Sequence, residues 1–493
     1  MSVLVPLAVL APIIAACGGL ALGRFPLLRD TLTLAGLVTS CVASVAILVG
    51  VRADGPTVIR VGGWDPELGI VLVADLFAAL ILVVSTGTIL LVEIFSLGQR
   101  RSEVDADPNL VGPMLGVLTA GVCLAIVTGD LFTLFVAFEL ILVSSYVLLT
   151  HQAKRQQIRS GMSYVVINLL ASTLFLLGIA YVYAATGTVN FALLAERVPD
   201  LDDGVRLGIG AWFLVVFGTK AAMFPLFSWL PDSYPTAPTT ITAVFAGLLT
   251  KIGVYVMIRF HTLTGMDDLG GVILIAAGLT MAVGVAGALA QNDVKRILSF
   301  HVISQIGYML MGLGLFEVAG IAGAVFFLVH HMPVKTVLFL VGGLIEHDQR
   351  TSALDRIGGL AGRRPLLALL FAVPALSLAG IPPFSGFVAK LALIDAGLSG
   401  GSYAIVVVAL VVGLLTLLSM TKIWIGGFWG TPTEPSGPDR TSIAGTRVMY
   451  GATACAVGAT LAIAATAGPI WEWSQMIAGD LLDPRVYIEQ VLG

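Results

Sequence analysis

Residues 218–232 read GTKAAMFPLFSWLPD, which places one lysine and two prolines inside an otherwise apolar stretch. Proline lacks the backbone N–H and clashes with the preceding helical turn, so Pro225 and Pro231 predict a broken helix. Lys220 lies five residues before the first proline. A charge near the centre of a bilayer costs at least about 2.5 kcal/mol. A broken apolar helix that carries such a charge indicates an ion or proton path across a membrane.

The composition of the whole chain is that of an integral membrane protein. Of its 493 residues, 57% are hydrophobic and only 11% are charged, and the mean hydropathy is +0.98. The net charge of -4 comes without a basic arm, so we expect no nucleic-acid partner. The four cysteines lie far apart, and no phosphate-binding motif is present. We therefore expect a transporter in the lipid bilayer, not an enzyme, with no metal and no cofactor.

Fourteen apolar segments are long enough to cross a bilayer. The predicted spans are 3–22, 31–51, 70–97, 110–128, 131–150, 162–186, 206–229, 239–260, 270–290, 300–316, 318–345, 366–397, 402–428 and 447–469. Loops after odd-numbered spans hold sixteen Arg and Lys residues, and loops after even-numbered spans, with the tail, hold six. The positive-inside rule then predicts a multi-pass, all-α protein of the cytoplasmic membrane with both termini outside the cell.

A short internal repeat joins the seventh and twelfth spans. Residues 225–228 read PLFS, and residues 382–385 read PPFS, an offset of 157 residues (382 minus 225). Pro382 and Pro383 therefore predict a second broken helix. The copies are five spans apart, an odd number, so they cross the membrane in opposite directions, as paired broken helices do in inverted-repeat transporters. Two unrelated proline kinks are the alternative.

The repeat predicts four segments of chain. They are three leading helices (1–109), a first five-helix repeat of helices 4–8 (110–262), a second, inverted repeat of helices 9–13 (263–430), and a last helix with a tail (431–493).

Titratable residues recur deep inside the predicted spans. They are Glu139, Lys220, Lys251, His330, His331, Lys335 and Lys390. Glu139 lies near the middle of its span, too deep for its short side chain to reach water. Histidine titrates near neutral pH and suits a relay between lysines. For each residue the alternative is structural: an ion pair, or a hydrogen bond to backbone groups freed by a helix break.

These stretches resemble a known superfamily. Residues 218–232, with Ala237-Pro238 and residues 250–255 (TKIGVY), resemble the signature of antiporter-like membrane subunits. That superfamily includes proton-pumping subunits of respiratory complex I and the large subunits of multisubunit Mrp-type Na+/H+ antiporters. Phe138-Glu139-Leu140, residues 330–336 (HHMPVKT), and residues 380–387 (GIPPFSGF) followed by Lys390 extend the resemblance over nearly the whole chain. The length and the residues around Lys251 and Lys335 are most similar to the D-type branch of the Mrp antiporter family.

The resemblance implies a role for each buried charge. It pairs Lys220 with Glu139 and implies a lateral proton path from there through Lys251 and the histidines to Lys390. It also implies a hetero-oligomer with a large A-type subunit and small membrane subunits, which exchanges Na+ for H+ and is driven by the proton gradient. A proton-pumping subunit of a complex I-like or hydrogenase-like redox machine is an alternative. A scaffold subunit that has lost transport is a third possibility.

Overall fold

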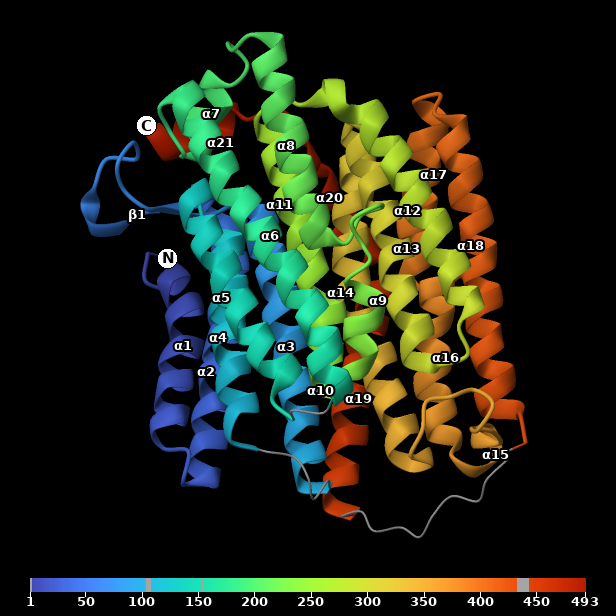
Figure 1. Ribbon diagram of the computed structural model, residues 1–493. Coiled ribbons are helices and arrows are strands. Elements are labelled where there is room, and N and C mark those ends of the chain that lie inside the picture. Colours follow the sequence, from blue (N-terminus) through green and yellow to red (C-terminus); the bar gives the residue numbers. More distant parts are fainter. Residues whose placement is uncertain (1, 103–107, 153–154, 432–442) are drawn as a thin grey trace.

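The computed structural model describes residues 2–102, 108–152, 155–431 and 443–493. Nearly all of these residues are helical, and the long helices stand side by side in one bundle (Figure 1). Within the described residues, thirteen helical segments are long and apolar enough to cross a membrane. The remaining predicted span, 366–397, is divided between two shorter helices. The expected all-helical architecture is therefore present.

The helices follow the order of the predicted spans, and their ends differ from the prediction by up to eight residues. The first half of the chain forms α1 (Leu4–Ala21), α2 (Pro26–Asp54), α3 (Leu76–Ser102), α4 (Pro108–Val127), α5 (Leu131–Thr150), α6 (Arg155–Thr186), α7 (Phe191–Arg197), α8 (Asp203–Ala221) and α9 (Leu230–Ser233). The second half forms α10 (Thr239–Val244), α11 (Thr250–Leu263), α12 (Gly270–Ala290), α13 (Val294–Leu315), α14 (Val318–Gln349), α15 (Leu360–Arg363), α16 (Pro365–Ala379), α17 (Ser385–Ser399), α18 (Tyr403–Ile423), α19 (Ile443–Ala465), α20 (Ala467–Leu482) and α21 (Arg485–Leu492).

Both predicted helix breaks are present, and they have the same backbone design. α8 ends where Ala222 adopts a left-handed conformation, and α16 ends where Gly380 does. The N–H of Met223 donates to the carbonyl of Gly218, and the N–H of Ile381 donates to that of Leu376, the hydrogen bond of a Schellman cap. Each helix therefore stops at its cap, a few residues before the proline of the repeat. Pro231 was predicted to break a helix, but it does not. It lies in the first turn of α9, where a proline is tolerated.

The two broken crossings run in opposite directions. In Figure 1, α8 descends from the upper end of the bundle to its break, whereas α16 rises from the lower end and α17 continues above it. This arrangement agrees with the opposite orientation that the inverted repeat requires.

A second matched pair of features involves α5 and α13, at a constant offset of 163 residues. Asp130 caps α5 by accepting from the N–H of Thr133, and Asp293 caps α13 by accepting from that of Arg296. The residue after each cap donates its backbone N–H to a distant loop: Leu131 to Val189 and Val294 to Ser352. In the other direction, the N–H of Phe191 donates to the carbonyl of Gly129, and the N–H of Leu354 donates to that of Asn292. Equivalent helices in the two halves are thus capped and tied in the same way.

A β-hairpin replaces the start of the third predicted span. β1 (Thr57–Arg60) pairs antiparallel with β2 (Val71–Ala74), and α3 follows it. The prediction that this span is helical from residue 70 is therefore wrong by six residues, since α3 begins at residue 76. The valine-rich, buried stretch 71–74 suits a strand, and the carbonyl of Val71 also accepts from the N–H of Gly129.

The C-terminal tail, expected only to follow the last span, forms two further helices. α20 buries Ile470, Ser474, Ile477, Ala478 and Leu481, the spacing of one helical face, and packs on α14. α21 lies at the upper end of Figure 1. Its Val491 carbonyl accepts from the Arg60 side chain at 2.9 Å, which ties the tail to the hairpin.

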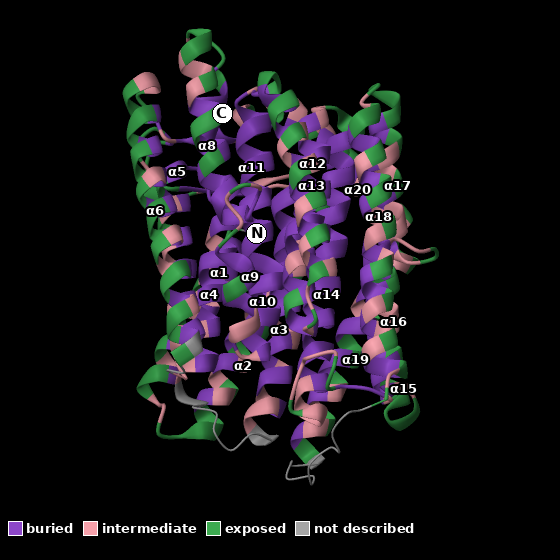
Figure 2. Cartoon of the chain, turned by 45° about the vertical axis from the view of Figure 1, so that its right-hand side comes forward, coloured by how far each residue is buried: buried purple, intermediate pink, exposed green. Residues whose placement is uncertain are grey.

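Burial identifies the axis of the bundle. In the most apolar 18-residue stretches of the crossings 239–263 and 318–349 every residue is buried, whereas only 33% of the residues are buried in the corresponding stretches of α1 and α19. Figure 2 shows the same contrast between a buried centre and exposed outer faces. We call the lower end of Figure 1, which holds the α1–α2 turn and α15, the basic face. Two of the basic residues that predict its orientation, Lys154 and Arg440, lie outside the described residues.

Candidate functional site

The four lysines predicted to lie within the membrane are all buried in the bundle. Lys251 and Lys335 are fully buried, and Lys220 and Lys390 are nearly so. His330 and His331 are buried with them on α14, whereas Glu139 on α5 is half-buried. Since a buried ammonium requires hydrogen-bond partners, the contacts of each lysine indicate what the site does.

Lys220 and Glu139 interact without touching. The Lys220 Nζ donates to the Asn168 carbonyl at 3.4 Å and to the Ser172 Oγ at 3.2 Å, both on α6, and lies 5.7 Å from the centre of the Phe138 ring. The charge of Glu139 acts on Lys220. The Glu139 Oε1 is nevertheless buried without a hydrogen-bond partner among the described residues. The resemblance implies that Lys220 and Glu139 form a pair. In the structure their side chains make no direct hydrogen bond or ion pair.

A small cavity lies beside Lys220. Its volume is about 20 Å³, and Lys220, Asn168, Tyr164 and Leu249 are among the residues that line it. A cavity of this size has room for about one water molecule. The cavity is therefore a site for a water molecule beside Lys220, and Leu249 brings the crossing that carries Lys251 to its wall.

Lys251 follows an irregular helical turn. Residues 245–249 form a π turn (η3) between α10 and α11, which alters the backbone hydrogen bonding there. The Lys251 Nζ donates to the Ala246 carbonyl in this turn. Gly247 permits the close packing of α14, because a Cβ there would lie 2.1 Å from the Thr336 Oγ1. A carbonyl accepts from an ammonium or a neutral amine alike, so this bond persists when the lysine loses a proton.

His331 lies at the electrostatic centre of the site. The charges of Lys251, Lys335 and Lys390 all act on its ring. Both ring nitrogens are buried and have no hydrogen-bond partner among the described residues. Its neighbour His330 is hydrogen-bonded through Nδ1 to the Ser385 Oγ at 2.8 Å, on the first turn of α17. A buried ring with two unpaired nitrogens is a natural site for a water molecule or a transferred proton.

Lys335 and Lys390 bind backbone carbonyls of neighbouring helices. The Lys335 Nζ donates to the Leu298 carbonyl on α13 at 3.0 Å. The Lys390 Nζ donates to the carbonyls of Leu378 and Ala379, each at 3.0 Å. These last two are terminal carbonyls of α16, which the break leaves without helical partners. The second break thus supplies the acceptors that hold Lys390.

His301 on α13 is a member of the site that the sequence analysis missed. Its Nε2 is hydrogen-bonded to the Ser419 Oγ at 2.8 Å, its Nδ1 has no described partner, and the charges of Lys335 and Lys390 both act on it. The predicted span began at residue 300, which placed His301 at the membrane edge. Because α13 begins at Val294, the ring lies two turns inside the helix. The sequence signal was the presence of two polar residues, His301 and Gln305, four positions apart in an apolar stretch.

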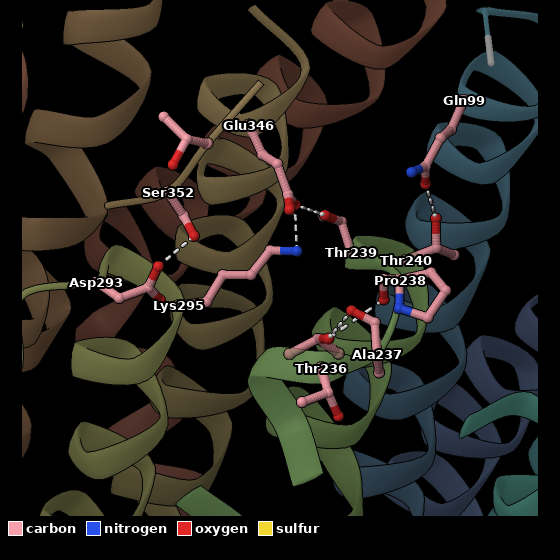
Figure 3. Close-up of polar contacts among 12 residues, drawn as sticks. Gln99, Thr236, Ala237, Pro238, Thr239, Thr240, Asp293, Lys295, Glu346 and Ser352 are labelled. Carbon is pink, nitrogen blue, oxygen red and sulfur yellow. Dashed lines mark hydrogen bonds and ion pairs between the residues drawn. The ribbon is translucent and has the colours of Figure 1, made fainter. Parts of the chain in front are cut away.

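A polar cavity of about 290 Å³ lies between this site and the basic face. Figure 3 shows the Lys295 ammonium paired with the Glu346 carboxylate, which also accepts from the Thr239 Oγ1 at 3.4 Å. Lys295 was expected in a loop, but it is buried in the first turn of α13. Only one helical turn, about 4.5 Å of rise, separates it from Leu298, whose carbonyl holds Lys335. The cavity therefore reaches close to the lysine row.

Two further buried ion pairs, Arg259–Asp75 and Arg100–Glu93, were also not predicted. Arg259, at the end of the predicted span 239–260 and counted there with the loop that follows, lies inside α11 and donates to the Tyr255 hydroxyl at 3.1 Å. Both pairs contain a carboxylate and an arginine in direct contact, unlike Glu139 and Lys220. They therefore have the geometry of structural pairs.

The fold and its row of buried charges define a multi-pass membrane protein with a polar axis, of the kind that moves ions or protons. Residues 128–416 match the family described as NADH:quinone oxidoreductase/Mrp antiporter, TM. The chain is 42% identical to the D-type subunit of the Na(+)/H(+) antiporter of Alkalihalophilus pseudofirmus over 496 residues, which is 100% of each chain. It belongs to the NADH:quinone oxidoreductase/Mrp antiporter membrane family.

Two solved structures have the same fold. A chain in the structure of the Mrp complex from Dietzia sp. DQ12-45-1b aligns with a TM-score of 0.90 and 35% identity over 100% of both chains. A chain of the membrane-bound sulfane sulfur reductase, an archaeal respiratory membrane complex, aligns with a TM-score of 0.90 and 26% identity over 99% of both. The fold thus occurs in an Mrp complex and in a respiratory complex.

Proposed function

We propose that this chain is the D-type subunit of a multisubunit Na+/H+ antiporter and carries protons along its buried charges. The observation that carries the proposal is that all four lysines are buried in one bundle and each donates to a backbone carbonyl, with the two histidines buried among them. Glu139 acts on Lys220, Lys251 acts on Lys335 and His331, and Lys335 and Lys390 both act on His301. The step from Lys220 to Lys251 has no such interaction, and we propose that a water molecule in the cavity beside Lys220 supports it.

Charge repulsion drives transfer along this row. A proton that arrives on Glu139 removes the negative charge that favours the ammonium form of Lys220, so Lys220 releases its proton towards Lys251. Ammonium groups at Lys251 and Lys335 repel each other, so a proton gained by one is displaced from the other. Each lysine keeps its carbonyl acceptor when neutral. The transfer therefore needs no cofactor and little movement of the helices.

We assign proton access from the cytoplasm to the polar cavity beside Lys295 and Glu346. The excess of arginine and lysine predicts that the basic face is cytoplasmic, with both termini on the other side of the cytoplasmic membrane. The Glu346 carboxylate is 42% exposed and so lies within reach of water, whereas Lys295 beside it is buried. The shared caps and breaks of the two halves support the proposed inverted repeats, 110–262 and 263–430.

The named relative and the Mrp complex support the expected partners, a large A-type subunit and small membrane subunits. A second candidate function is a membrane component of a redox-driven proton pump. The observation that supports it is the likeness to the archaeal respiratory complex. Two measurements separate these functions. Purification through a tag on this chain should recover Mrp subunits, and an imposed pH gradient should drive Na+ exchange in vesicles. Recovery of redox subunits, or transport that requires an electron donor, would replace the antiporter with the pump.

A further inference from the structure

A large cavity opens at the basic face, away from the lysine row. It has a volume of about 680 Å³ and lies between the end of α14, the start of α16 and the start of α19. These three helices pack against one another. The volume is in the range of pockets that hold small molecules. No residue of the proposed proton path lines it.

The charged residues of this cavity favour an anion. Arg363, Arg364 and Arg447 line it, and Asp348 is the carboxylate among its described lining residues. Asp348 is bound by Arg364 at 2.8 Å. Arg447 is exposed near the start of α19. Guanidinium groups bind phosphate through two parallel N–H donors, so this arrangement suits a phosphate or phosphodiester group.

An apolar surface continues from the charged end. Leu366 lines the cavity and is 52% exposed, and Leu369, one turn further along α16, is 60% exposed. Leu376 continues the same face towards the middle of the bundle. Tyr450 lines the cavity as well, a residue type enriched where a protein meets lipid headgroups. The complementary ligand therefore has an anionic head and apolar tails.

We propose that this cavity binds the phosphate headgroup of an anionic phospholipid, with its acyl chains along Leu366 and Leu369. Basic pockets between membrane helices on the cytoplasmic side are suited to such headgroups. The site lies at the foot of α16. The same helix, 15 residues long, ends in the carbonyls that hold Lys390. A bound lipid thus supports the helix that positions one end of the lysine row.

Native mass spectrometry of the purified complex tests the proposal. The complex is titrated with phosphatidylglycerol, with phosphatidylcholine, and with phosphatidylglycerol in the presence of inorganic phosphate. We expect one phosphatidylglycerol to bind preferentially, and inorganic phosphate not to displace it. Equal binding of phosphatidylcholine, or full displacement by phosphate, would overturn the proposal, the latter by identifying a site for free anions. This comparison uses the unaltered complex and does not depend on the folding of a variant.

Variants locate the bound lipid. Arg447→Gln removes an exposed charge-assisted donor and should weaken phosphatidylglycerol binding about tenfold. Arg24→Gln, at an exposed arginine on the basic face away from the cavity, is the matched control and should leave this binding unchanged. A photo-crosslinking amino acid in place of Leu366 should form a lipid adduct. Equal effects of the two arginine variants, or crosslinking to another protein of the complex instead of lipid, would contradict the assignment.

Discussion

The two broken crossings have the same cap but hold their lysines differently. Lys220 lies before its break, donates to α6 and is under the influence of Glu139. Lys390 lies after its break and donates to the terminal carbonyls of the preceding half-helix. The offset of 163 places Val302, next to His301, at the position equivalent to Glu139 (139 plus 163). The two lysines thus differ in their surroundings: Lys220 has partners on α6 and the Glu139 carboxylate on α5, whereas Lys390 is held by carbonyls at the end of α16.

The largest expected effect follows from removing that carboxylate. Glu139→Ala should abolish Na+-dependent dissipation of ΔpH in vesicles, because Lys220 loses a negative charge that favours its ammonium form. The complex should still assemble, since the Glu139 Oε1 makes no described hydrogen bond. Glu472→Ala, at an exposed position on α20, is the control. Antiport at the level of the unaltered protein in assembled Glu139→Ala complexes would show that Lys220 does not depend on the carboxylate. The two halves would then not differ in this respect.

Lys390 should respond to the type of charge. Lys390→Arg keeps the positive charge but does not release a proton at working pH, so most antiport should be lost while assembly remains normal. Lys390→Glu should retain more activity than Lys390→Ala, because a carboxylate still exchanges protons. Transport by the three variants is compared at equal expression. Near-normal transport by Lys390→Arg would make this lysine a structural cation and remove it from the proton path.

A smaller effect is expected at the cap of the second break. Gly380 has φ +87, and a Cβ there would lie 2.8 Å from the Lys390 Cδ. Gly380→Ala should therefore lower the free energy of unfolding by about 1–2 kcal/mol. Gly271→Ala on α12, where a Cβ meets nothing within 4 Å, should have little effect. Thermal unfolding of the purified complex measures both. Equal melting temperatures would mean that the second break tolerates a side chain as the first tolerates Ala222.

The smallest expected effect concerns the cap of α5. Burial raises the pKa of the Asp130 carboxyl, an effect that the hydrogen bond from Thr133 partly offsets. Ionisation is thus less favourable in the folded state, and stability is lost as pH rises from about 4 through the raised pKa. Asp130→Asn keeps the cap and should remove this loss, whereas Asp130→Ala should cost about 1 kcal/mol. Melting temperatures between pH 4 and pH 8 test this, with the exposed Asp202→Asn as control. The same pH slope in Asp130→Asn would exclude Asp130 as its source.

Sequence patterns predicted the order of the helices and both breaks, because long apolar runs and prolines act locally. They did not predict where each helix stops, since the left-handed caps at Ala222 and Gly380 lie before the prolines. The hairpin was missed because Val71–Ala74 is as apolar as a membrane helix. His301 and Lys295 were missed for a related reason. Their burial depends on where α13 begins, and hydropathy does not define that position to within a turn.

The π turn before Lys251 sets the direction in which that lysine points from the helix, because it changes the number of residues in one turn. Each residue of an α-helix turns the chain by about 100°, and a π turn accommodates one residue more than an α turn. If residues 245–249 were all kept but became a regular α-helix, the extra residue would rotate one side of the turn by about 100° relative to the other. Lys251 and the Thr239 end of the crossing could not then both keep their present neighbours on α14. The helical phase of this crossing is therefore as much a part of the site as the lysine itself.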